Sequence, residues 1–109
     1  LVVDEILFLY QITKGDKYMP RTDFVEKTIF NIEGFNVNFM KNGKNLRGEV
    51  QQPSNYIANK ASKNTYTVSR FIDKLKKQYP GYDFEVLKAD GEPADSRMTL
   101  ATVRDTYSE

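Results

Sequence analysis

The sequence predicts an α+β domain in which an antiparallel sheet is packed by an amphipathic helix. Three observations support this fold class: two stretches in which apolar and polar residues alternate, an Asn-Gly turn, and a helical apolar period near the middle of the chain. A length of 109 residues suits one domain. Met19, directly before Pro20, is a candidate initiator. We therefore expect residues 1–18 to be an accessory N-terminal segment and residues 19–109 to form a single domain.

The sheet is expected to combine an antiparallel meander over residues 24–50 with a strand over residues 82–88. The meander would open with residues 24–32, which are rich in Val, Ile, Thr and Phe. After a Glu33-Gly34 turn, apolar and polar residues alternate up to Asn42-Gly43, a pair that favours a tight hairpin turn. The later strand shows the same alternation at Tyr82, Phe84 and Val86.

Two segments have patterns that fit more than one element. The apolar run over residues 6–12 suits a strand by composition, although a helical turn would bury it equally well. Residues 96–107 follow a turn and contain threonines, which suits the return strand of a hairpin. Their apolar residues Leu100, Val103 and Tyr107 nevertheless share one helical face, so a helix is favoured there.

The middle of the chain predicts two helices. A short helix would begin at Pro53 and place Ile57, Ala58 and Ala61 on one side. The second, over residues 67–79, would be capped by Thr65 or Thr67 and ended by Pro80-Gly81. Its apolar residues follow the i, i+3, i+4, i+7 pattern of a buried stripe: Val68, Phe71, Ile72, Leu75 and Tyr79.

Composition argues against most enzyme chemistry. The chain contains neither Cys nor His, which removes thiolate zinc sites, cysteine nucleophiles and imidazole bases. The six glycines are dispersed and form no phosphate-binding loop. We therefore expect a non-enzymatic protein without cofactor or metal, and the lack of Cys fits the cytoplasm. The apolar run in residues 1–10 is too short to span a membrane, so no membrane partner is expected.

Positive charge is concentrated in the middle of the chain. The net charge is only +1, but residues 41–77 hold nine Lys and Arg against two Asp and Glu, a net charge of +7. On the predicted helix, Arg70, Lys74 and Lys77 lie opposite the apolar stripe, and Lys60 and Lys63 precede it. Such a group of cations suits a polyanion such as DNA.

Residues 57–72 carry a more specific pattern. An Ile57-Ala58 pair is followed three residues later by Ala61 and then by Thr67-Val-Ser-Arg70, which opens the second helix. This spacing resembles the helix-turn-helix segment of the lac-repressor family. The resemblance implies that the second helix reads DNA, with five residues near the bases or the backbone: Thr65, Tyr66, Thr67, Ser69 and Arg70.

Two classes of function follow from these observations. The first is a DNA-binding protein that uses the residues named above together with Lys60, Lys63, Lys74 and Lys77. The second is a protein-interaction module, such as a small inhibitor or accessory protein, that docks on an acidic protein partner. An ordinary solvated surface would give the same charge pattern, in which case Asp73 would pair with Lys76 or Lys77.

Overall fold

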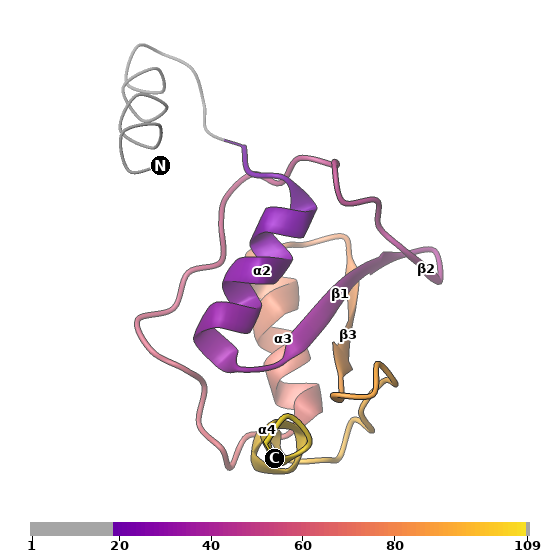
Figure 1. The fold of residues 1–109 in the computed structure, drawn as a ribbon. Coiled ribbons are helices and arrows are strands. Elements are labelled where there is room, and N and C mark those ends of the chain that lie inside the picture. Colours follow the sequence, from indigo (N-terminus) through magenta and orange to yellow (C-terminus); the bar gives the residue numbers. More distant parts are fainter. Residues whose placement is uncertain (1–18, 109) are drawn as a thin grey trace.

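The computed structural model describes residues 19–108, which form an α+β domain, so the predicted fold class is confirmed. The elements follow the order α2 (Thr22–Glu33), β1 (Asn36–Lys41), β2 (Lys44–Asn45), α3 (Val68–Gln78), β3 (Asp83–Leu87) and α4 (Leu100–Asp105). Helix α2 packs along β1 and α3 along β3, with α4 at one end (Figure 1). The element expected over residues 6–12 lies outside this range. None of the described helices is long and apolar enough to cross a bilayer.

The sheet has the strand order β2-β1-β3 and its neighbouring strands are antiparallel. Phe39 pairs with Phe84, and alternate residues of β1 and β3 are buried, as the period of two predicts. At the hairpin turn Asn42 and Gly43 have φ values of 54° and 76°, the left-handed conformations that this pair favours. The predicted hairpin and the strand predicted over residues 82–88 are therefore confirmed.

Residues 24–32 belong to α2, so their prediction as the first strand of a meander is wrong. Their β-branched composition suggests a strand, but their burial has the spacing of one helix face. The buried positions are Thr22, Val25, Ile29 and Glu33. Phe24 and Phe30 lie off this face and are 47% and 38% exposed. The helix ends at Gly34, whose φ of 87° few other residues adopt without strain.

Residues 53–61 contain no helix, which corrects a second prediction. The expected apolar stripe has little to bury against, since Ile57 is 69% exposed. The segment instead runs beside α3 and uses its side chains as hydrogen-bond partners. The Gln78 amide receives a hydrogen bond from Ile57 N at 3.2 Å and donates one to Ile57 O at 3.1 Å, while the Tyr79 hydroxyl donates to Ser54 O at 3.0 Å. These bonds replace the helical ones that the segment lacks.

Helix α3 confirms the helix predicted over residues 67–79 and supplies much of the core. Its residues Val68, Phe71 and Leu75 are buried, as is Tyr79 directly after it. Aromatic rings meet edge to face across the layers: Phe71 lies 5.2 Å from Phe35, and Tyr79 lies 5.0 Å from the Phe39 ring. This geometry places the positive ring edges against negative ring faces and adds to the burial energy.

The starts of α3 and α4 cap each other. Helix α4 confirms the helix favoured over residues 96–107, and its first turn faces the first turn of α3. Thr67 and Thr99 each accept a backbone N–H three residues ahead, and they face each other in an isolated antiparallel bridge. Four reciprocal backbone bonds of 2.8–3.1 Å join the two turns: Val68 N to Met98 O, Ser69 N to Ser96 O, Leu100 N to Tyr66 O and Ala101 N to Asn64 O. The N–H groups that helix starts normally leave free are thereby satisfied.

Replacing the cap of α3 should lower stability without changing the fold. The Thr67 hydroxyl accepts from Arg70 N at 3.2 Å, so we expect Thr67→Ala to lower the free energy of unfolding by about 1 kcal/mol. Urea denaturation measures this change. Thr65→Ala is the matched control, since Thr65 is exposed two residues before the cap. An equal loss in both variants would show that Thr67 has no capping role.

Candidate functional site

The carboxylate of Glu33, the last residue of α2, lies at the centre of a buried polar cluster. It accepts hydrogen bonds from the Tyr56 hydroxyl at 2.5 Å, from Ser62 N at 2.8 Å and from the Arg104 guanidinium at 2.9 Å. The Lys74 ammonium lies 3.9 Å away and donates to the Ser62 hydroxyl at 3.2 Å. We call these five residues the Glu33 network.

The donors of this network offset the cost of burying a charge. The Glu33 side chain has no exposed surface, and an isolated carboxylate there would be strongly destabilising. Burial raises the pKa of Tyr56 well above its usual value, and the hydrogen bond to Glu33 raises it further. The hydroxyl therefore stays protonated and donates to the carboxylate. The network thus acts as a structural connection that fixes the 54–62 segment and Lys74 beside each other.

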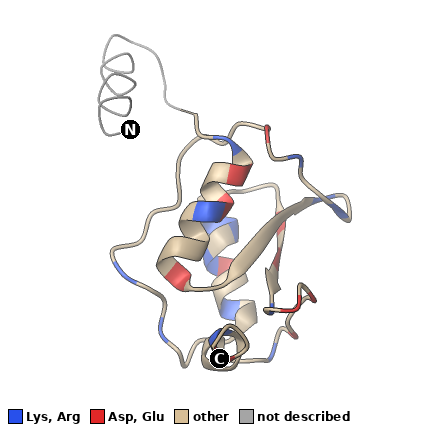
Figure 2. Ribbon diagram, viewed as in Figure 1, with Lys and Arg blue, Asp and Glu red and all other residues tan. Residues whose placement is uncertain are grey.

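This connection fastens a loop that carries cations beside a helix that also carries cations. The 54–62 segment is fastened along α3 at Gln78, Tyr79 and Lys74, so the exposed Lys60 and Lys63 extend from a loop that lies beside the helix. Spacings of four and three residues place the α3 cations on one face. The five residues, which we call the basic face, are Lys60, Lys63, Arg70, Lys74 and Lys77. Figure 2 shows Lys and Arg on the loop and on α3, whereas Asp and Glu gather in the turn after β3.

A shallow hollow of about 350 Å³ opens on the basic face. It is lined by Tyr66, Arg70, Asp73, Lys74 and Lys77. The Arg70 guanidinium lies over the Tyr66 ring, with its central carbon 4.0 Å from the ring centre. Stacking of this kind restricts the long Arg side chain and holds its charge at the rim of the hollow.

Asp73 does not form the ion pairs that an ordinary solvated surface would predict. Lys76 pairs instead with Asp83 on β3, at 3.4 Å. Across residues 19–108 no carboxylate lies within 4.0 Å of the Lys77 nitrogen, and none of the cations there pairs with Asp73. The charges of Arg70, Asp73 and Lys77 therefore face solvent or a bound partner.

The other predicted site residues divide into two groups. Thr65 and Ser69 are exposed beside the basic face, and Tyr66 and Arg70 form its stacked pair. Thr67 is half-buried and engaged in capping, so its hydroxyl is committed to the fold. Three further cations, Lys41, Lys44 and Arg47, lie in or next to the β1–β2 hairpin and apart from this surface, because the hairpin and the 54–62 segment lie on opposite sides of the domain (Figure 1).

The sequence analysis did not identify the buried residues that support the basic face. The sequence predicts Glu33 in a turn and assigns no role to Tyr56, Ser62 or Arg104. A usable signal was present: Glu33 continues the four-residue spacing of Val25 and Ile29 once that segment is recognised as helical. A charged residue on an apolar helix face predicts a buried ion pair. Among the described residues, no group of three or more acidic side chains is placed to hold a metal ion.

Removing the central charge should destabilise the domain. Glu33→Gln would leave Arg104 with a weakened partner in a buried setting, so we expect the free energy of unfolding to fall by about 3 kcal/mol. Urea denaturation at neutral pH measures it. Glu26→Gln is the control: Glu26 accepts only Phe39 N among the described donors, and burial raises the pKa of this carboxyl. That variant should match or slightly exceed the stability of the wild type, because Gln keeps an acceptor oxygen. Equal losses would contradict a special role for Glu33.

Comparison with known proteins gives no relative whose function could be transferred to this chain. No family model, curated protein or solved structure matches this chain. The helix-turn-helix resemblance therefore rests on residues 57–72 alone. Helix α3 lies where the second helix of that motif is expected, while residues 57–62 carry no helix. The basic face is thus the feature of the described residues from which a function is best inferred.

Proposed function

We propose that this chain is a non-enzymatic binding protein that contacts DNA through the basic face. The observation that carries the proposal is that the Glu33 network fastens the loop that bears Lys60 and Lys63 alongside the helix that bears Arg70, Lys74 and Lys77. Here the same network positions Lys74 and fastens the loop that bears Lys60 and Lys63.

Charge and spacing suit a phosphate backbone. Arg70 and Lys77 lie seven residues apart on α3, a rise of roughly 10 Å along the helix axis. Because Lys and Arg side chains are long, cations at this spacing can contact nearby phosphates and release the counterions condensed on them, which supplies most of the affinity of non-specific DNA binding. Arg70 adds a planar fork of donors suited to phosphate oxygens.

The side of α3, and not its first turn, is proposed as the contact surface. The first N–H groups of α3 donate to Met98 O and Ser96 O of the turn before α4. They are therefore unavailable to a phosphate, and Thr67 is committed as the cap. Contacts would come from Arg70, Lys74 and Lys77, with the exposed Ser69 beside them.

An acidic protein surface is the alternative partner. Arg and Tyr are enriched among the residues that dominate binding energy at protein interfaces, and the stacked Tyr66–Arg70 pair supplies both types. Charge complementarity would steer such a partner to the same face. The two candidates differ in one measurable respect, because only DNA binding is abolished by nuclease treatment.

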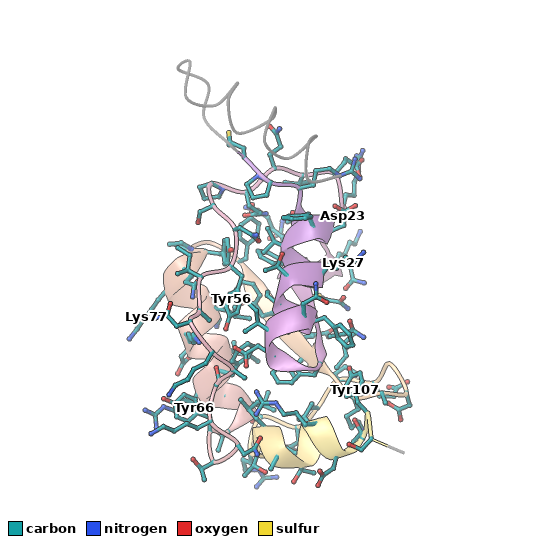
Figure 3. The ribbon with its side chains drawn as sticks, turned by 60° about the vertical axis from the view of Figure 1, so that its left-hand side comes forward. Asp23, Lys27, Tyr56, Tyr66, Lys77 and Tyr107 are labelled. Atoms are coloured by element: carbon teal, nitrogen blue, oxygen red, sulfur yellow. The ribbon has the colours of Figure 1, made fainter. Side chains whose placement is uncertain are left out.

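Removing one cation from the basic face should weaken DNA binding in a salt-dependent way. We expect Lys77→Ala to lower affinity severalfold at low salt and to reduce the slope of log K against log salt by about one. Lys27→Ala is the matched control, since Lys27 is an exposed helical lysine that points away from Lys77 (Figure 3). Fluorescence anisotropy with a labelled duplex and with one of its strands measures both variants.

Three outcomes would contradict the proposal. These are no binding to either form of DNA at low salt, binding that is insensitive to salt, and equal losses in Lys77→Ala and Lys27→Ala. Co-purification of an acidic protein that survives nuclease treatment, and is lost in Lys77→Ala, would support the alternative.

A further inference from the structure

Asp73 is out of place on a surface that binds only phosphates. It lies between Arg70 and Lys77 on α3 and lines the hollow that they share. A carboxylate there repels a phosphate, and it is not neutralised by an ion pair among the described residues. A carboxylate does, however, accept hydrogen bonds from amino groups, and an acidic side chain in contact with DNA typically reads the amino group of cytosine.

The stacked Arg70 supplies a planar surface next to this carboxylate. The central carbon of its guanidinium lies over the Tyr66 ring, 4.0 Å from the ring centre, and Arg70 as a whole is exposed. The side of the guanidinium that faces away from Tyr66 would receive a second flat group. Nucleobases stack on Arg and on aromatic residues in proteins that bind single strands, whatever their sequence.

Stacking on Arg70 requires a base whose face is free. In duplex DNA the faces of the bases are covered by their neighbours, and exposing one costs a few kcal/mol. In a single strand this cost is much smaller. The hollow thus favours single-stranded DNA over the duplex, while Lys74 and Lys77 remain suited to the flanking phosphates.

We infer that the hollow binds one unstacked nucleobase bearing an exocyclic amino group, of which cytosine is the smallest example. The base would stack on Arg70, and its amino group would donate to the Asp73 carboxylate. This inference rests on the proposed function and gives it a substrate class: single-stranded DNA with a preference for amino-bearing bases. Asp73 then determines the preference for amino-bearing bases, whereas Lys74 and Lys77 determine the overall affinity for the strand.

Two homopolymers test the role of Asp73. Oligonucleotides of dC and dU of equal length differ at one group of the base. Cytosine carries an amino group that donates a hydrogen bond, whereas uracil carries a carbonyl oxygen that accepts one. By fluorescence anisotropy at neutral pH and low salt, the wild type should bind dC about fivefold more tightly than dU. Asp73→Asn should bring the two affinities within about twofold and raise both, because the amide can also donate to uracil and one negative charge is lost.

Two further variants separate stacking and overall charge from recognition. Arg70→Lys keeps the charge but removes the planar face, so single-strand affinity should fall roughly tenfold with little effect on the duplex. Glu92→Gln removes an acidic charge from an exposed residue in the turn after β3 and should leave the preference for dC unchanged.

The outcomes distinguish this inference from the proposed function. Salt-dependent DNA binding without a dC preference, a preference that persists in Asp73→Asn, or indifference to Arg70→Lys would overturn the inference and leave the proposed function intact. Failure to bind duplex, dC and dU alike would overturn both. Circular dichroism of each variant establishes that the exposed substitutions leave the fold unchanged.

Discussion

The burial of one carboxylate organises this domain. Glu33 ends α2 on the face that points into the core, so its charge must be matched where it lies. The matching groups come from three other parts of the chain: Tyr56 and Ser62 from the loop, Lys74 from α3 and Arg104 from α4. An irregular loop, two helices and the end of a third are thereby held in one arrangement. Replacing any one donor leaves the others around a charge that they no longer fully satisfy.

The position of Lys74 at the surface depends on the buried Glu33 network. Lys74 belongs both to the Glu33 network and to the basic face, since its ammonium reaches Ser62 while a third of its side chain remains exposed. The loop cations are placed through the same contact. Electrostatics inside and outside the domain are therefore coupled through Lys74, whose ammonium lies 3.9 Å from the buried carboxylate.

Local patterns predicted elements whose burial follows their period. The Asn42-Gly43 hairpin, β3 and α3 have clear periods of two or 3.6, and each was expected at nearly its observed position. The prediction for residues 24–32 was wrong because their composition favours a strand, while the spacing of Val25, Ile29 and Glu33 favours a helix. The prediction for residues 53–61 was wrong in the opposite sense, since their apolar spacing fits a helix, whereas Ile57 is exposed and the segment forms hydrogen bonds with α3 side chains instead. The Glu33 network joins residues up to 71 positions apart, and no local pattern encodes that proximity.

The reciprocal capping of α3 and α4 has a consequence for the order in which the domain is built during translation. Helix α3 needs carbonyl groups of Ser96 and Met98 to satisfy its first turn, and α2 needs Arg104 for its buried charge. Tyr107 also bridges the two main strands, accepting from Asn36 N and donating to Leu87 O. While residues 96–107 are still inside the ribosome, these earlier segments lack those partners. Synthesis runs from the N-terminus, so we expect the buried charge of α2 and the first turn of α3 to stay unsatisfied until residues 96–107 have emerged.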